Sequence, residues 1–68
     1  MITETVKDWL ANDLNELIDD AEGTLGNEKL WLLGSTDPEA VSAHAENIQN
    51  ICEYIGVLGE VIKCILEA

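Results

Sequence analysis

Arginine is absent from this chain, and only three lysines stand against fourteen aspartates and glutamates, for a formal net charge of −11. Binding to nucleic acid requires clustered cations that neutralise phosphates, and anionic membrane surfaces attract basic segments. The charge therefore excludes direct contact with nucleic acid and with membranes. It favours solubility, or a basic protein as partner.

Phenylalanine is also absent, and the chain has one proline and five glycines. Turn-forming residues are thus too few for a fold of many short strands, while 47% hydrophobic residues argue against disorder. A core built from 68 residues is small, so a monomer would be marginally stable, and self-association is one common remedy. We expect one all-α domain over residues 1–68.

Long hydrophobic runs are missing as well. Glu53, Glu60 and Lys63 interrupt the most apolar segment before it reaches the length that spans a membrane. The first four residues, Met-Ile-Thr-Glu, lack the basic and apolar regions of a signal peptide. The sequence therefore predicts a cytoplasmic protein.

Residues that carry chemistry are scarce. Cys52 and Cys64 lie twelve positions apart, roughly 18 Å along one helix, which is beyond disulfide reach. We expect both to be buried free thiols, unreactive in apolar surroundings. His44 is the only histidine, and Val41 holds the position where a di-iron helix would carry glutamate. No phosphate loop, C-x-x-C or zinc spacing is found. We expect no enzyme activity, no metal and no cofactor, with His44 a boundary residue.

The stretch from Asp37 to Ala68 organises the chain. Thr36 or Asp37 can cap a helix, and Pro38 fits its first turn. Apolar residues at helical spacing then form one stripe: Val41, His44, Ala45, Ile48, Ile51, Cys52, Ile55, Leu58, Ile62, Ile65 and Leu66. Tyr54, Val57, Val61 and Cys64 form a second apolar row beside it. A helix that is apolar on two sides needs more than one covering partner.

Two glycines leave the course of this helix open. Gly56 could kink it, since glycine costs about 1 kcal/mol of helix propensity relative to alanine. Alternatively, Gly59 lies on the apolar stripe and could admit a neighbouring helix closely.

The first half of the chain predicts a second long helix. Thr3 or Thr5 can cap it, and Gly23 supplies a stop. A loop over residues 23–27 should precede a short helix at 28–33, capped by Asn27 and Glu28, with Trp31 as a core plug. Trp9 lies beside the apolar stripe, either as a boundary residue or as a contact anchor.

Together these patterns predict helices over residues 4–22, 28–33 and 37–67. The two long helices form a hairpin, the short middle helix crosses it, and dimerisation completes a bundle. In size, acidity, lack of arginine and paired amphipathic helices, the chain resembles the short accessory proteins of phages and conjugative elements, a mobile-element class. The resemblance implies binding to a protein of the host or of the element, and it assigns no functional residue.

Two functional hypotheses follow. The first is a non-enzymatic interaction module that forms a homodimer through the second apolar row and its neighbour, with Tyr54, Val57, Leu58, Val61 and Cys64 in contact. The second is an acidic decoy, because carboxylates one helical turn apart imitate the spacing of phosphates toward a basic protein. Its residues would be Asp8, Trp9, Asp13, Glu16, Asp19 and Asp20.

Overall fold

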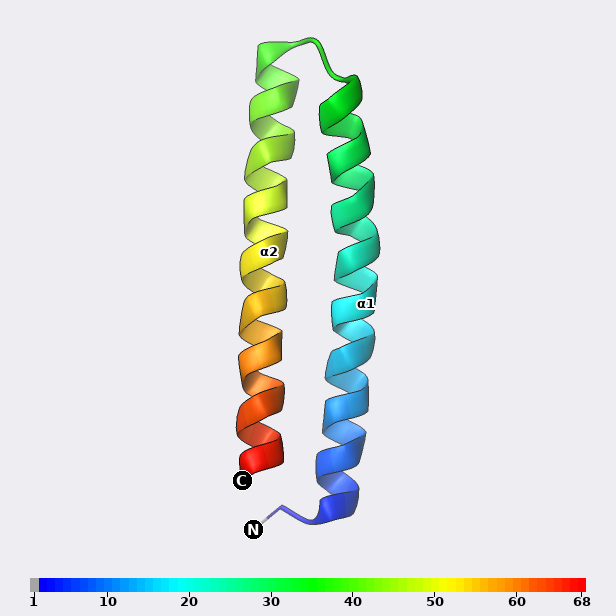
Figure 1. Cartoon of the computed structure of the whole chain (residues 1–68), viewed down its shortest axis with the longest axis vertical. Coiled ribbons are helices and arrows are strands. Elements are labelled where there is room, and N and C mark those ends of the chain that lie inside the picture. The colour runs from blue at the N-terminus through cyan, green and yellow to red at the C-terminus, as the bar shows by residue number, and fades with distance from the viewer. Residues whose placement is uncertain (1) are drawn as a thin grey trace.

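The chain folds into two long helices that lie side by side and run in opposite directions. A computed structural model describes residues 2–68, with α1 at Glu4–Gly34 and α2 at Pro38–Glu67. The pair measures 52 × 15 × 10 Å between its outermost Cα atoms. As Figure 1 shows, the connection between the helices lies at one end, here called the loop end. At the other, the open end, α1 begins beside the last turn of α2.

Side-chain caps explain where each helix begins. The hydroxyl oxygen of Thr3 accepts a hydrogen bond from the amide of Val6 at 3.2 Å, and the Asp37 carboxylate accepts one from the amide of Glu39 at 3.2 Å. At the end of α1, the Ser35 hydroxyl donates to the carbonyl of Trp31. Only residues 35–37 join the helices, and so short a connection requires antiparallel neighbours. The predicted long helix over residues 37–67 is thus confirmed.

The predicted stop at Gly23 and the separate helix at 28–33 are wrong, because α1 continues without a break to Gly34. Asn27 and Glu28 therefore cap nothing. No residue between 2 and 68 has the positive φ that a glycine stop requires. The cost of glycine in a helix is outweighed here by packing, since Leu25 and Leu32 continue the row of residues that α2 covers. Tertiary contact overrides local propensity.

The least exposed residues of each helix recur at spacings of three and four, which alternate except at the start of α2, and this is the pattern of a coiled-coil seam. From α1 the seam contains Lys7, Ala11, Leu14, Ile18, Ala21, Leu25, Glu28 and Leu32. From α2 it contains Ala40, His44, Ile48, Ile51, Ile55, Leu58, Ile62 and Ile65. Because each spacing pair averages 3.5 residues, one narrow face of each helix stays against the other along the whole hairpin.

Small residues of α1 lie level with large residues of α2. Lys7 bonds to the backbone oxygen of Ala68, and Glu28 bonds to His44, which sets the register of the antiparallel pair. This register places Ala11 level with Ile62 and Ala21 level with Ile51. Ala11 and Ala21 are among the most buried residues of the chain. Alternation of small and large side chains lets the helices approach closely.

Neither Gly56 nor Gly59 disturbs α2, which is one continuous helix. A Cβ atom added at Gly59 would meet nothing within 4 Å, so the predicted close approach of a neighbouring helix does not occur within the hairpin. Of the two possibilities left open by the sequence, the break near Gly56 does not occur either, because α2 is continuous through it. Neither helix contains a stretch, within residues 2–68, that is both long and apolar enough to cross a membrane.

Replacing Gly23, Gly26 and Gly56 together by alanine should raise the free energy of unfolding by about 1.5 to 3 kcal/mol, since each change removes about 0.5 to 1 kcal/mol of helix cost. Added Cβ atoms at all three meet open space. Urea unfolding at one fixed protein concentration measures the gain. Gly34→Ala, at the last helical residue, is the matched control and should gain less. A loss of stability in the triple variant would contradict the continuous helices.

The core between the two helices is thin. Four residues of the described chain are buried, namely Lys7, Ala11, Ala21 and Leu58, and no large side chain there is fully enclosed. Trp31 is 67% exposed, so it is not the core plug of this hairpin. The predicted burial of the thiols is also wrong, because Cys52 and Cys64 are both exposed. A single hairpin leaves much of its apolar surface uncovered.

Candidate functional site

Apolar side chains gather along one side of the hairpin at its open end. In an antiparallel pair, the residues that directly precede alternate seam residues lie on the same side of both helices. On α1 these include Leu10 and Leu17, and on α2 they include Tyr54 and Val61. With their neighbours they form a surface that we call the side wall: Ile2, Val6, Leu10, Leu17, Tyr54, Val57, Val61 and Cys64. All eight are exposed.

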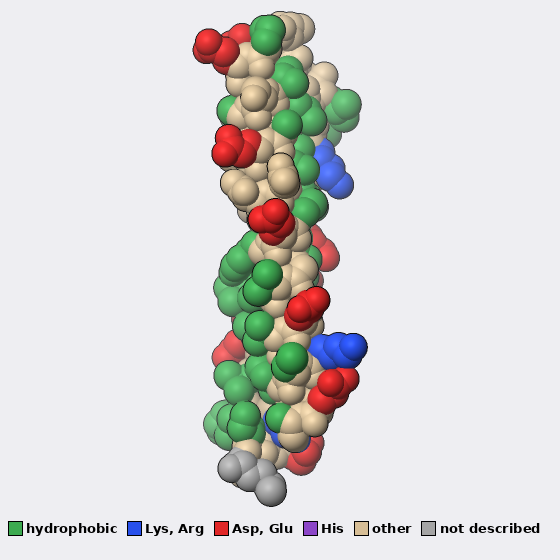
Figure 2. Space-filling view, turned by 90° about the vertical axis from the view of Figure 1, so that its left-hand side faces the viewer, with side chains coloured by type: hydrophobic (Ala, Val, Ile, Leu, Met, Phe, Trp, Pro, Cys, Tyr) green, Lys and Arg blue, Asp and Glu red, His purple; other side chains and the backbone are tan. Residues whose placement is uncertain are grey.

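Figure 2 looks onto α2 and shows the charge boundary of the side wall. Acidic side chains run diagonally across the view, from the left edge near the loop to the right edge near the chain ends, and hydrophobic side chains gather to their left in the half nearer the chain ends. The acidic file consists of Glu39, Glu46, Glu53, Glu60 and Glu67, which recur every seven residues. The side wall is therefore an apolar strip with a charged border, the composition expected of a contact surface with a polar rim.

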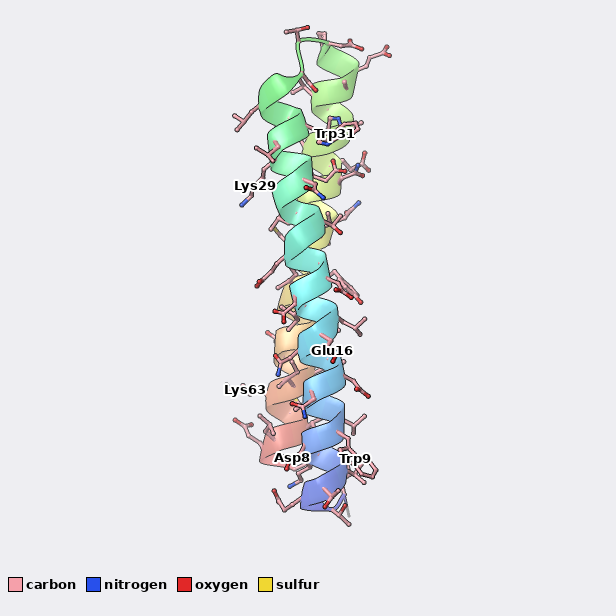
Figure 3. The ribbon with its side chains drawn as sticks, turned by 90° about the vertical axis from the view of Figure 1, so that its right-hand side faces the viewer. Asp8, Trp9, Glu16, Lys29, Trp31 and Lys63 are labelled. Carbon is pink, nitrogen blue, oxygen red and sulfur yellow. The ribbon has the colours of Figure 1, made fainter. Side chains whose placement is uncertain are left out.

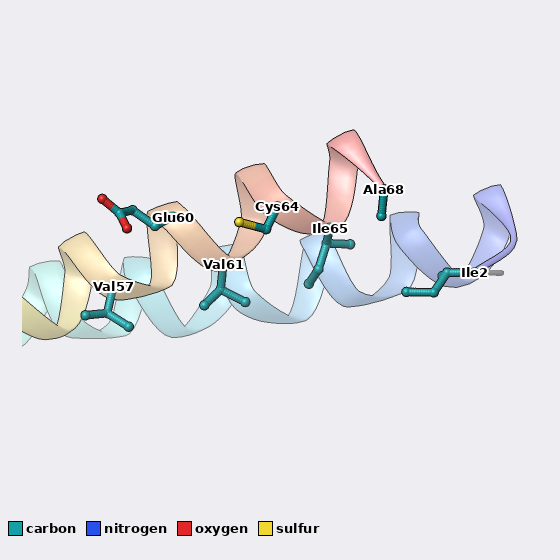
Figure 4. Close-up of a pocket in the computed structure, with 7 residues that line it drawn as sticks. All are labelled: Ile2, Val57, Glu60, Val61, Cys64, Ile65 and Ala68. Carbon is teal, nitrogen blue, oxygen red and sulfur yellow. The ribbon is translucent and has the colours of Figure 1, made fainter.

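An open groove deepens the side wall near the end of α2. Its volume is about 390 Å³, and it is lined by Ile2, Val57, Glu60, Val61, Cys64, Ile65 and Ala68. In Figure 4 the side chains of Val57, Val61 and Ile65 point in one direction from successive turns, with Ile2 beyond them. The lining is apolar except for Glu60, so the groove suits an apolar side chain rather than a polar ligand.

The self-association residues predicted from the sequence divide into two groups. Tyr54, Val57, Val61 and Cys64 lie together on the side wall, and Val57 is 61% exposed. Leu58 does not belong with them, because it is buried in the seam. The α1 half of the wall, with Val6, Leu10 and Leu17, was missing from the prediction. These residues are recognised only once the seam is known, because each leucine lies directly before a seam residue.

The six residues of the predicted acidic face are all exposed on α1: Asp8, Trp9, Asp13, Glu16, Asp19 and Asp20. In Figure 3, Asp8 and Trp9 project from opposite edges of the helix with Glu16 between them. Lys7 is turned inward, where it pairs with Glu4 and the backbone oxygen of Ala68. The outer surface of α1 from Asp8 to Asp20 therefore carries no positive charge.

A polar layer interrupts the seam near the loop end. Nδ1 of His44 lies 2.6 Å from Oε2 of Glu28, and the Asn47 amide donates to the same oxygen at 3.4 Å. The ring of Trp31 stands edge-on to the imidazole, with centroids 5.7 Å apart. His44 is thus a half-buried partner of Glu28 within the hairpin. One polar layer in an apolar seam specifies which residues lie opposite one another.

The hydrogen bond from His44 holds the pKa of Glu28 below its ordinary value of 4.5, with Asn47 adding to the effect. A lowered pKa in the folded state means that this carboxylate stabilises the fold above about pH 4.5, and that the contribution is lost as pH falls through the folded pKa. Glu28→Gln should therefore be less stable than wild type at pH 7, with the difference shrinking below pH 4.5. Urea unfolding at pH 7, 5 and 3.5 tests this.

The matched control for Glu28→Gln is Glu16→Gln, a change on the solvent face of the same helix. The control should follow the wild type at each pH value. A stability difference for Glu28→Gln that stays constant from pH 7 to 3.5 would contradict the role of the carboxylate.

Within residues 2–68, no three His, Cys, Asp or Glu side chains are grouped so that they could hold a metal ion. Comparisons of the chain with models of protein families, with curated proteins and with solved structures give no match.

Proposed function

We propose that this chain is a non-enzymatic protein interaction module that pairs with a second copy through the side wall. The observation that carries the proposal is the surface of the lone hairpin, which exposes 5049 Å². A compact protein of 7.4 kDa exposes about 4200 Å². The excess of about 800 Å² equals what each partner contributes to an interface of standard size.

The energetics of the hairpin support the same proposal. A two-helix pair that buries only four residues gains little from its own core, and conformational entropy opposes the ordering of every residue. Covering the side wall with a second copy removes apolar surface from water, at about 25 cal/mol per Å². Association would thus supply the stability that the seam lacks.

Molar mass in solution, measured by light scattering across a concentration series, tests the proposal. We expect the mass of two chains at tens of micromolar and a fall toward one chain on dilution. Thermal unfolding should shift to higher temperature as protein concentration rises, because association stabilises only the folded form. A mass of one chain throughout the series would remove the proposal.

The exposed acidic surface of α1 favours a second candidate function, an acidic decoy for a basic nucleic-acid-binding protein. Its support is the run from Asp8 to Asp20, which carries five exposed carboxylates and no outward cation. The partner would be a basic protein of the host or of a mobile element, as the resemblance implies. Such a complex should weaken steeply with salt and with the double reversal Asp13→Lys and Glu16→Lys. A captured partner that stays bound in both conditions would exclude the decoy.

A further inference from the structure

We infer that the two copies lie side by side with their loops at the same end, α1 of each against α2 of the other, and Trp31 seated over Ala40 and Ala43 of the second copy. The inference rests on the proposed self-association and specifies its geometry. It explains why a tryptophan beside the seam is 67% exposed in the single hairpin.

An isologous dimer brings the same face of both copies together about a twofold axis. For a hairpin, this axis lies either along the helices or across them. An axis along the helices keeps both loops at one end, so each level of α1 meets the same level of α2 in the second copy. An axis across the helices places the loops at opposite ends, so the open end of one copy meets the loop end of the other when they overlap fully.

The side that carries the wall changes character along its length. Toward the open end it is apolar on both helices except at Asp13, which lies in the same row as Val6 and Asp20. Toward the loop, the same rows continue with polar residues, namely Asp20, Thr24 and Asn27 on α1 and Asn47 and Asn50 on α2. Loops at the same end pair apolar with apolar and polar with polar. Loops at opposite ends, with full overlap, would cover Val61 and Cys64 with the polar half.

The sizes of the side chains also fit when the two loops lie at the same end. The register set by the Glu28 and His44 bond places Trp31 level with the first turns of α2. Ala43 lies there directly before the seam residue His44, on the side that carries the wall, and the seam residue Ala40 lies about one turn before it. A large aromatic side chain on α1 therefore meets two small ones on α2 when the loops coincide. This contact occurs twice in the dimer, once for the Trp31 of each copy.

The extent of the contact decides against an overlap of the open ends alone. The side wall occupies only residues 2–17, at the start of the chain and in α1, and residues 54–64 in α2. This is about 20 Å of helix at 1.5 Å per residue, less than half of the 52 Å hairpin. Covering the excess surface requires contact over most of the length, which only the arrangement with loops at one end provides without mismatch.

The net charge of −11 on each copy weakens the association, but it does not select against this arrangement. The half nearest the loop, residues 19–53, contains eight Asp or Glu and one Lys. Glu46 and Glu53 belong to the acidic file on the outer face of α2, turned away from the second copy. Exposed charges separated by more than about 8 Å are largely screened at physiological ionic strength. The association should accordingly tighten when salt is raised.

The test is a distance between loops. Thr36→Cys, in a full-length background with Cys52→Ala and Cys64→Val, carries one spin label per chain, and the valine keeps an apolar side chain in the wall. Pulsed electron resonance should give a label separation on the order of 20 to 30 Å if the loops coincide. A separation near the 52 Å length of the hairpin or beyond would overturn this geometry while leaving the dimer intact. No dipolar coupling together with the mass of one chain would remove the proposed function as well.

A pair of tryptophan variants tests the contact of Trp31 with the second copy directly. Trp31→Ala should raise the dimer dissociation constant at least tenfold. Trp9→Ala is the matched control, because Trp9 is exposed to a similar extent, 64%, and lies on the outer face of α1. It should change the constant less than twofold. Equal effects of the two variants, or a larger effect of Trp9→Ala, would contradict the seating of Trp31.

Discussion

Replacing Val61 by aspartate should convert the protein to a monomer at concentrations where the wild type is a dimer. Val61 lies in the side wall and lines its groove. Burying an unpaired polar group costs about 2 kcal/mol or more, and a twofold interface contains the change twice. We therefore expect at least a hundredfold weaker association, since each 1.4 kcal/mol is a factor of ten. Sedimentation equilibrium on both proteins measures the difference.

Leu33→Asp is the control for Val61→Asp. Leu33 is 83% exposed at the loop end and lies outside the side wall, so an equal change of charge there should leave the association nearly unchanged. If Val61→Asp kept the mass of the wild type while the wild type was dimeric, the side wall would not be the contact surface. Equal weakening by both variants would show that net charge, rather than the wall, controls association.

Replacing Leu58 by alanine should lower the free energy of unfolding by about 2 to 4 kcal/mol, the range for truncating a buried leucine. Among residues 2–68, Leu58 is the one large apolar side chain that is buried. Small domains have about 5 to 15 kcal/mol in total, and this hairpin should lie at the low end, so the variant should lose much of its helix content at room temperature. Circular dichroism with urea unfolding measures the loss.

Val57→Ala, the neighbouring residue on the side wall, separates folding from association. Val57 is 61% exposed, so its truncation should change the unfolding of the isolated hairpin by less than about 0.5 kcal/mol while weakening the dimer. The urea unfolding of Val57→Ala and of Leu58→Ala is measured in the background of Val61→Asp, where association is removed. A similar loss of stability for both variants there would contradict the division between seam and wall.

Much of the fold could be predicted because its signals are local. Thr3 and Asp37 cap the two helices through their own side chains, and Pro38 fits the first turn of α2. The stop predicted at Gly23 is wrong, because local sequence does not distinguish a glycine within a helix from a glycine that follows one. What distinguishes them is whether the next turns have a partner, and α2 supplies one for Leu25 and Leu32.

The candidate site was half predictable. Tyr54, Val57, Val61 and Cys64 lie beside a longer apolar stripe on one helix, so a second apolar row could be recognised from spacing alone. The residues of α1 could not be assigned in the same way, because Leu10 lies directly before Ala11 and either could face α2. Leu58 was misplaced for the same reason. Which of two successive residues faces the partner helix is known only when the direction of that helix is known.

The amino-acid sequence by itself determined the helical class, the start of each helix, the acidic surface and the surplus of apolar side chains, because these depend on composition and on contacts within a few residues. Only the tertiary structure decided that α1 runs unbroken to Gly34, that Glu28 pairs with His44, and which apolar residues form the seam and which form the wall. The physical reason is that these outcomes depend on the register of residues far apart in the chain, which the antiparallel packing of the helices sets.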